Sequence, residues 1–201
     1  MLLNKTKLFL VPCIFLAMVF RQDKPFYGKL ARSAVAQTHS KVTYNPAYVR
    51  MGYPGGDVPA STGVCTDLVI RAYRSLGIDL QKEVHEDMTK YFKEYPAFWS
   101  LKAPDSNIDH RRVPNLMTFF KRKKADLALS KDPSDYKPGD LVTWNLGNKY
   151  SMNGITHIGI ITEEKTPDEK GYKIAHNIGA GNQVEDMLFS YVIIGHYRYA
   201  L

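Results

Sequence analysis

The amino-acid sequence predicts an α+β domain, in which helices from the first half of the chain pack on an antiparallel sheet from the second half. Two patterns indicate this class. Apolar residues recur at helical spacing between residues 65 and 124, and short apolar runs separated by turn residues follow between residues 140 and 199. Helices followed by consecutive strands are typical of α+β folds. With 201 residues, 44% of them hydrophobic, the chain is long enough for one domain with its own core.

Residues 1–36 are expected to form an export signal or a membrane anchor that precedes a domain of residues 37–201. Met1–Lys7 is a short basic segment, and Leu8–Phe20 is an apolar run of signal-peptide length, shorter than the roughly 20 residues of a membrane span. Ala34-Val35-Ala36 has the small-x-small form of a cleavage site but lies far from the apolar run. We therefore expect a protein exported to the periplasm or cell envelope of a bacterium, attached to the membrane only if this segment is retained.

The formal net charge of +7 suggests at first a nucleic-acid or anionic-membrane partner. The excess is concentrated at the N-terminus, however. Six basic residues and one acidic residue precede residue 37, which leaves 21 basic and 19 acidic residues in the rest of the chain. The charge is therefore attributed to membrane targeting, and no nucleic-acid partner is expected.

Three helices are expected in the first half of the domain. Residues 37–62 are polar and rich in turn residues, which predicts an ordered loop that we call the arm. A helix should begin at Cys65, capped by Thr66 or Asp67, and end at Gly77. Its apolar face carries Leu68, Val69, Ala72, Tyr73 and Leu76. Two more helices are predicted at residues 81–93 and 114–124.

Four strands are expected in the second half. They cover residues 140–146, 157–162, 172–178 and 191–199. Each is rich in β-branched or aromatic residues and bounded by turns. Trp99 and Trp144 are expected to be core residues rather than ligand platforms.

Cys65 is the only cysteine after the N-terminal segment, and its predicted place is the first turn of a helix. The positive end of the helix dipole and the free backbone N–H groups there favour a thiolate, the nucleophilic form of cysteine. A catalytic thiol also needs a base, and the base needs a group that orients it. The structural alternative is a buried cysteine that acts as a small hydrophobic residue.

His157 and His176 are the candidate partners of Cys65, since they lie on successive predicted strands. We expect both on the face turned to the helix, with Gly159 leaving room for the helix to approach. Cys65 would then be the nucleophile, His157 the base and His176 the residue that orients His157. The same three residues are also acceptable zinc ligands, which remains an alternative.

Six further residues are candidates for substrate binding, although each has a structural alternative such as packing of the arm or a salt bridge. Three lie close to Cys65 in the sequence, and three form a polar cluster in which paired arginines are suited to bind a carboxylate. They are Tyr53, Asp57, Asp67, His110, Arg111 and Arg112.

The order of several motifs resembles a known family. They are YPGGDVP, GVCTDLVIRAYR, VHEDM, NIDHRRVPNL, PGDLVTWNL, HIGI, HNIGAG and GHYR, which cover roughly residues 44–199. On these motifs the chain is identified as a member of the DUF1287 family, and it resembles the NlpC/P60 superfamily of papain-like cysteine peptidases. Thr66-Asp67 follows Cys65 where many NlpC/P60 proteins have Ser-Gly.

The resemblance implies a papain-like NlpC/P60 fold with Cys65, His157 and His176 as the catalytic triad. It also implies a thiol hydrolase that cleaves amide bonds of cell-wall peptidoglycan peptides through an acyl-enzyme, as an endopeptidase or amidase. No cofactor and no metal are expected, and the protein should be a monomer. Two alternatives remain open, a non-catalytic wall-binding module and a Cys/His/His zinc site. Acyl transfer or thioester hydrolysis on lipid is the least favoured use of the triad.

Overall fold

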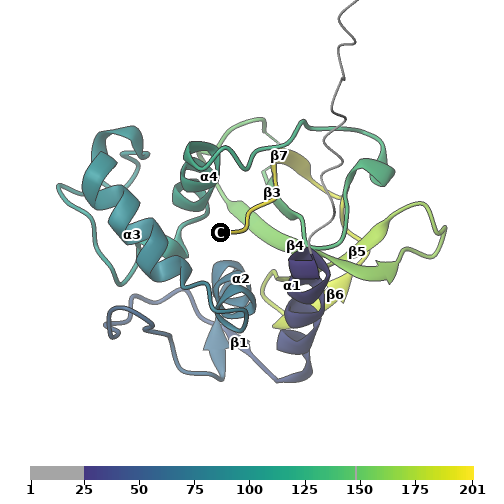
Figure 1. Ribbon diagram of the computed structural model, residues 1–201, viewed down its shortest axis with the longest axis horizontal. Coiled ribbons are helices and arrows are strands. Elements are labelled where there is room, and N and C mark those ends of the chain that lie inside the picture. The colour runs from purple at the N-terminus through teal and green to yellow at the C-terminus, as the bar shows by residue number, and fades with distance from the viewer. Residues whose placement is uncertain (1–24, 148) are drawn as a thin grey trace, which may run out of the picture.

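The computed structural model describes residues 25–147 and 149–201 and confirms the α+β class (Figure 1). The described part contains four α-helices: α1 Pro25–Ala36, α2 Cys65–Arg74, α3 Leu80–Tyr91 and α4 Val113–Arg122. Four 3-10 helices lie at Gln37–His39, Phe92–Glu94, Asp109–Arg111 and Pro133–Asp135. The strands are β1 Thr43–Tyr44, β2 Thr62–Gly63, β3 Leu141–Asn145, β4 Thr156–Lys165, β5 Tyr172–Asn177, β6 Asn182–Glu185 and β7 Val192–Tyr197.

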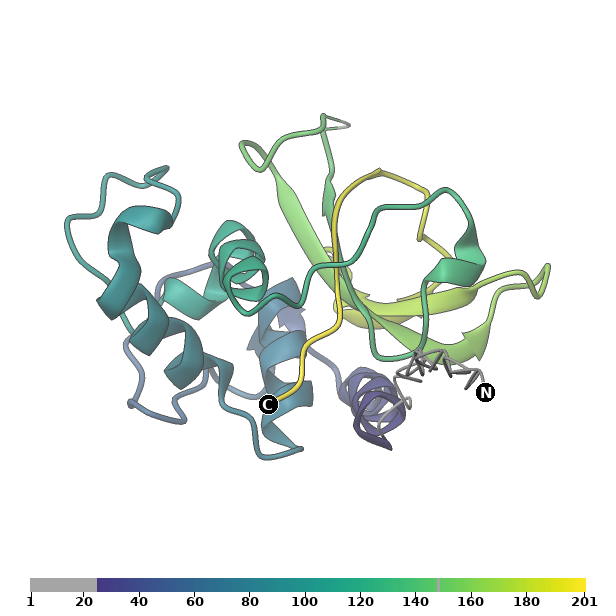
Figure 2. The ribbon, with the colours of Figure 1, turned by 45° about the horizontal axis from the view of Figure 1, so that its top comes forward.

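The main sheet has five strands in the order β6-β5-β4-β3-β7, and every neighbouring pair is antiparallel. Helices α2, α3 and α4 gather on one side of the molecule, and the sheet forms the other side (Figure 2). The four predicted strands and three predicted helices are confirmed. Strand β6 was not predicted, because its four residues are mostly polar and lack an apolar alternation.

Helix α2 begins at Cys65, as the sequence predicts, and packs on β4. Asp67 stabilises its first turn, since the Asp67 carboxylate accepts a 2.7 Å hydrogen bond from the backbone N–H of Val64. Leu68, Val69 and Tyr73 are almost completely buried on the face that meets the sheet. The helix is thus fixed at the end where the candidate nucleophile lies.

Each face of the sheet has its own hydrophobic cluster. Ile158, Ile160 and Ala175 pack in one cluster with residues of α2, α3 and α4. Ile161 and Ile174 belong to the second cluster, on the opposite face. The sheet is therefore buried on both sides, and neighbouring residues of β4 and β5 alternate between two different environments.

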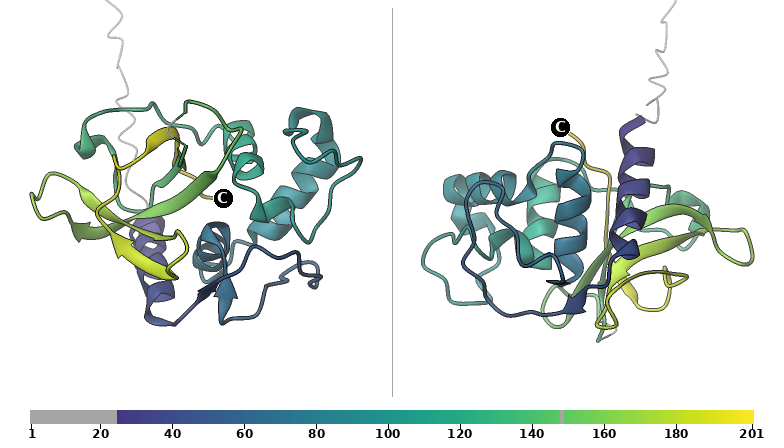
Figure 3. Two further views of the ribbon diagram at one scale, coloured as in Figure 1. Left: turned by 180° about the vertical axis from the view of Figure 1, so that it is seen from behind. Right: turned by 90° about the horizontal axis from the view of Figure 1, so that it is seen from below.

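Helix α1 corrects the expected boundary between leader and domain. It contacts α2 and β4, and Figure 3 shows it beside α2 on the same side of the sheet. Leu30, Ala31 and Ala34 are completely buried. Residues 25–36 therefore belong to the folded domain, and cleavage after Ala36 would remove an element of its core. The expected basic and apolar segments of the leader lie outside the described residues.

No helix within residues 25–147 and 149–201 has both the length and the apolarity needed to cross a membrane. The new boundary also shifts the charge balance, because Lys29 and Arg32 now belong to the domain.

The packing of α1 predicts that Leu30→Ala lowers the free energy of unfolding by about 2–5 kcal/mol, the usual cost of truncating a fully buried leucine. Urea denaturation measures this loss. Lys29→Ala is the matched control, since Lys29 is exposed on the same helix and its replacement should change stability by less than about 0.5 kcal/mol. Equal stability of the Leu30 variant and the wild type would show that α1 is not part of the core.

Candidate active site

Cys65 occupies the first position of α2, where the helix meets the beginning of β4. The side chain is buried, with 6% exposed. Its sulfur accepts hydrogen bonds from backbone N–H groups, including that of Ile158. Because Ile158 directly follows His157, this contact brings the thiol to the part of β4 that carries the candidate base.

His157 begins a chain of hydrogen bonds that runs across three strands. Nε2 of His157 lies 2.9 Å from Nδ1 of His176 on β5. Nε2 of His176 lies 2.8 Å from Oε2 of Glu185 on β6. Both histidine side chains are buried, with 3% and 0% exposed, so each depends on these partners for its polar atoms. The expected pairing of His157 with His176 is present.

The register of the sheet corrects the face on which these histidines were expected. His176 pairs with Gly159, and His157 pairs with Trp144, so all four lie on the face of the second hydrophobic cluster. The body of α2 packs on the other face. Cys65 therefore reaches β4 at the backbone of Ile158, the residue that follows His157, rather than across the middle of the sheet.

The space left by the missing side chain of Gly159 is filled by residues of β5 and not, as was expected, by the helix. A Cβ atom at this position would lie 2.5 Å from Cγ2 of Ile174 and 3.2 Å from Cβ of His176. The space that glycine leaves open is thus occupied by side chains of the neighbouring strand. This close approach lets His176 extend past Gly159 to reach His157.

Burial keeps the resting site uncharged. It raises the pKa of the Cys65 thiol to about 11, and the backbone N–H groups of Ile158 and Thr66 only partly oppose this rise. Burial, with a smaller effect of the neighbouring His176, also lowers the pKa of His157 to about 3. Burial of Cys65 thus opposes the thiolate that the helix terminus was expected to favour, because desolvation penalises the charged form.

This charge state predicts slow alkylation of Cys65 by iodoacetamide at pH 7, on the order of 100-fold slower than for a free cysteine whose pKa is about 8.5. The rate should keep rising up to about pH 11, since only the thiolate reacts. Mass spectrometry of the Cys65 peptide measures it, with protein unfolded in urea as the control. A rate that is already constant from pH 5 upward would instead indicate a thiolate–imidazolium pair.

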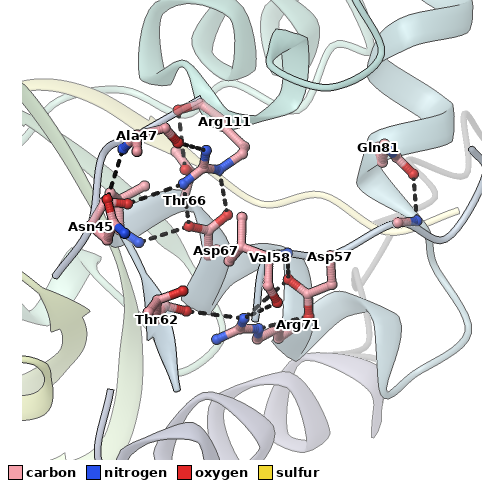
Figure 4. Close-up of polar contacts among 12 residues, drawn as sticks. Asn45, Ala47, Asp57, Val58, Thr62, Thr66, Asp67, Arg71, Gln81 and Arg111 are labelled. Carbon is pink, nitrogen blue, oxygen red and sulfur yellow. Dashed lines mark hydrogen bonds and ion pairs between the residues drawn. The ribbon is translucent and has the colours of Figure 1, made fainter. Parts of the chain in front are cut away.

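Asp67 and Arg111 form a buried ion pair beneath the first turn of α2 (Figure 4). Nε and a terminal nitrogen of Arg111 donate to the two Asp67 carboxylate oxygens at 2.9 and 3.0 Å. The same guanidinium donates to the backbone oxygens of Asn45 and Ala47 in the arm. Both side chains are thus engaged within the protein, and their contacts join α2 to the arm.

Asp57 has a structural partner as well. Its carboxylate accepts two hydrogen bonds from Arg71 of α2, at 2.8 and 3.1 Å (Figure 4). Gln81 of α3 holds the arm at a second point, since its side chain bonds the backbone of Gly52 and Gly56. Asp57 therefore anchors the arm to α2 and does not reach the thiol.

The thiol opens into a cavity of about 200 Å³. Its lining consists of Tyr44, Pro46, Val64, Cys65, Trp99, Ile108, Arg111, Arg112, Val113, Pro114 and Thr156. Arg112 is the one candidate binding residue that lines this cavity and is not engaged by Asp67. Its guanidinium carbon lies 4.1 Å from the ring centre of Trp99, and one terminal nitrogen is buried without a hydrogen-bond partner among the described residues.

Tyr53 and His110 do not line the cavity of Cys65. Tyr53 packs edge-on against His85, with ring centres 5.0 Å apart, and 42% of it is exposed. His110 is buried, and burial lowers its pKa to about 3. The fold therefore does not bring either residue to the cavity that contains the thiol.

Three residues of the site were missed or misassigned from the sequence. Glu185 completes the hydrogen-bond chain from the unpredicted strand β6. Tyr44 belongs to the arm and lines the cavity, where burial and then the nearby Cys65 raise its pKa. Trp99 lines the cavity and is 37% exposed, whereas Trp144 is in the core as expected. The place of Trp99 in a Pro-rich stretch, outside the predicted helices and strands, was the available hint.

Within residues 25–147 and 149–201, no group of three or more His, Cys, Asp and Glu side chains is arranged to hold a metal ion. The two imidazoles that a zinc site would need bond each other and Glu185 instead. The described geometry therefore gives no support to the zinc alternative.

Comparisons with known proteins identify the family. The "Uncharacterized protein YijF" of Escherichia coli (strain K12) is 55% identical over 170 residues, which are 85% of this chain and 80% of that protein. Two solved structures, NlpC1 and NlpC2 from Trichomonas vaginalis, are 18% and 16% identical, with TM-scores of 0.44 and 0.45. Each comparison covers 86% of this chain but only 44% and 46% of the other, so the chain spans less than half the length of those proteins. The family described as "Domain of unknown function (DUF1287)" matches residues 31–199, most of the chain, and this protein therefore belongs to the DUF1287 family.

Proposed function

We propose that this protein is a cysteine hydrolase that cleaves amide bonds in the peptides of cell-wall peptidoglycan. The observation that carries the proposal is the buried His157–His176 pair, in which His157 lies on the strand whose next residue, Ile158, contacts a thiol that lines a cavity. A nucleophile, a base and an orienting group in this order are the parts of a thiol acyl-transfer site. The choice of peptidoglycan rests on the sequence resemblance to NlpC/P60 peptidases.

The uncharged resting site determines the first step of the mechanism. Because Cys65 holds its proton at neutral pH, His157 accepts that proton as the sulfur attacks the substrate carbonyl. The nitrogen of His157 that bonds His176 is Nε2, which leaves Nδ1 for the thiol. His157 then donates the proton to the leaving amine, and the acyl group remains on the sulfur as a thioester.

Water completes the cycle. It attacks the thioester carbonyl while His157 accepts one of its protons, and the proton returns to the sulfur as the acid product leaves. In both steps the carbonyl oxygen becomes an oxyanion. The backbone N–H of Cys65, at the N-terminus of α2, is the proposed donor to it.

Digestion of purified sacculi tests the proposal. We expect the wild-type protein to release soluble fragments and the Cys65→Ala variant to release none, with mass spectrometry identifying the products. Product masses separate an endopeptidase from an amidase. Binding of both proteins to sacculi without release would favour the non-catalytic wall-binding alternative.

Arg112 is the proposed contact for a carboxylate of the substrate, since it lines the cavity and one of its terminal nitrogens has no hydrogen-bond partner among the described residues. Arg112→Gln is expected to raise KM about 10-fold and to change kcat less than about 3-fold, because a bound carboxylate is lost equally from the substrate and the transition state. Steady-state kinetics with a soluble muropeptide measures both constants. Lys121→Gln, at an exposed position of α4, is the charge-matched control. Unchanged KM would remove Arg112 from the binding site.

Export remains part of the proposal. The apolar run of the leader supports it, and the folded α1 indicates that a cleavage compatible with this fold precedes residue 25. N-terminal sequencing of the protein recovered from a cell-envelope fraction tests both points.

A further inference from the structure

We infer that Glu185 is a positioning residue that sets the proton arrangement of His157 through His176. This inference rests on the proposed function, because it concerns the base of that reaction. It is carried by the two successive hydrogen bonds that join the three side chains. Neither the thiol nor the substrate needs to touch Glu185.

The sheet brings Glu185 to the histidines from the edge strand. Glu185 ends β6 and pairs with Ile174, two residues from His176 on the same face of β5. The side chain of Glu185 is 46% exposed, whereas that of His176 is completely buried. The carboxylate thus lies at the boundary between solvent and the buried pair of rings.

The bonds fix which nitrogens carry hydrogen. An ionised carboxylate only accepts hydrogen bonds, so Nε2 of His176 must donate to Glu185. A neutral imidazole has one N–H group, and Nδ1 of His176 is therefore an acceptor. Nε2 of His157 must then donate to it, which leaves Nδ1 of His157 with a free lone pair. That is the form in which His157 can accept the proton of the thiol.

Glu185 also supplies the negative charge for the intermediate state. When His157 holds the thiol proton, a positive charge lies on a buried ring whose neighbour is a neutral, buried imidazole. Among the acidic residues of the described chain, Glu185 is the one bonded to this pair. No proton has to leave His176 or Glu185 at any step, since both only orient and stabilise.

Replacing Glu185 by glutamine removes the requirement that Nε2 of His176 carries the hydrogen. The amide of glutamine can present either its oxygen or its NH₂ group to His176, so the opposite arrangement becomes accessible, in which Nδ1 of His157 carries hydrogen. We expect Glu185→Gln to lower kcat about 100-fold and to change KM less than about 3-fold. Glu185→Asp, which keeps the charge, should recover part of the loss. Asp186→Asn, at the adjacent exposed position, is the matched control and should leave kcat unchanged.

Nitrogen-15 NMR of the histidine side chains provides a readout that does not depend on activity. In the wild-type protein, Nε2 of His157 should be the protonated nitrogen at pH 7. In Glu185→Gln, part of the signal should shift to the Nδ1-protonated form. Loss of kcat together with this shift supports the inference, and an unchanged kcat or an unchanged proton arrangement overturns it. If the wild-type protein hydrolyses nothing, the proposed function fails while the NMR experiment still decides the role of Glu185.

Discussion

Cys65→Ala is expected to lower kcat/KM for peptidoglycan fragments at least about 10⁴-fold, because it removes the thiol that forms the acyl-enzyme in the proposed mechanism. Among the residues that the structure describes, Cys65 is the only one with a sulfur atom that lines the cavity, and without it His157 has no nucleophile to deprotonate. The residual rate of the Cys65→Ala variant should come only from substrate binding and from the backbone N–H groups of α2 that stabilise the oxyanion. Kinetics with purified muropeptides measures the ratio.

The fold of this variant should persist. Cys65 is a small side chain at the edge of the helical cluster, so its truncation should cost no more than about 2 kcal/mol in urea denaturation. Cys65→Ser is the second variant, since it keeps the shape and replaces only the sulfur. Activity in either variant near the wild-type level would contradict a thiol mechanism.

Arg111→Met is expected to lower the free energy of unfolding by about 3–5 kcal/mol, the largest stability effect that we predict. The side chains of Arg111 and Asp67 are only 2% and 4% exposed, and removal of one partner leaves the other charge buried without compensation. The backbone oxygens of Asn45 and Ala47 lose their donors at the same time. Urea denaturation followed by circular dichroism measures the change.

Two comparisons make this prediction specific. Arg32→Met breaks the exposed ion pair of Arg32 with Glu163, whose side chains are 60% and 46% exposed, and should cost at most about 1 kcal/mol. The double variant Asp67→Asn/Arg111→Met removes both charges, so it should be more stable than Arg111→Met alone. A single-variant loss as small as that of Arg32→Met would mean that the buried pair does not hold the first turn of α2.

Local pattern was sufficient for most elements of the fold. The helical spacing of apolar residues predicts α2, and the apolar runs between turns predict the strands. In each case the spacing of the apolar residues shows which side of the element is buried. The local sequence pattern was insufficient for β6, because its mostly polar residues form a strand only by pairing with the edge of β5. Helix α1 was also missed, since an apolar leader directly before it makes residues 25–36 read as a continuation of that leader.

For the candidate site, the sequence determined which residues are the candidates, namely a lone cysteine at a helix start and a histidine on each of two successive strands. Only the tertiary structure decided how they are arranged and charged. It placed the histidines on the face away from α2, engaged Asp57 and Asp67 with arginines, and added Glu185. The physical reason is that ionisation and hydrogen bonding depend on burial and on contacts between distant segments, which the order of residues along the chain does not specify.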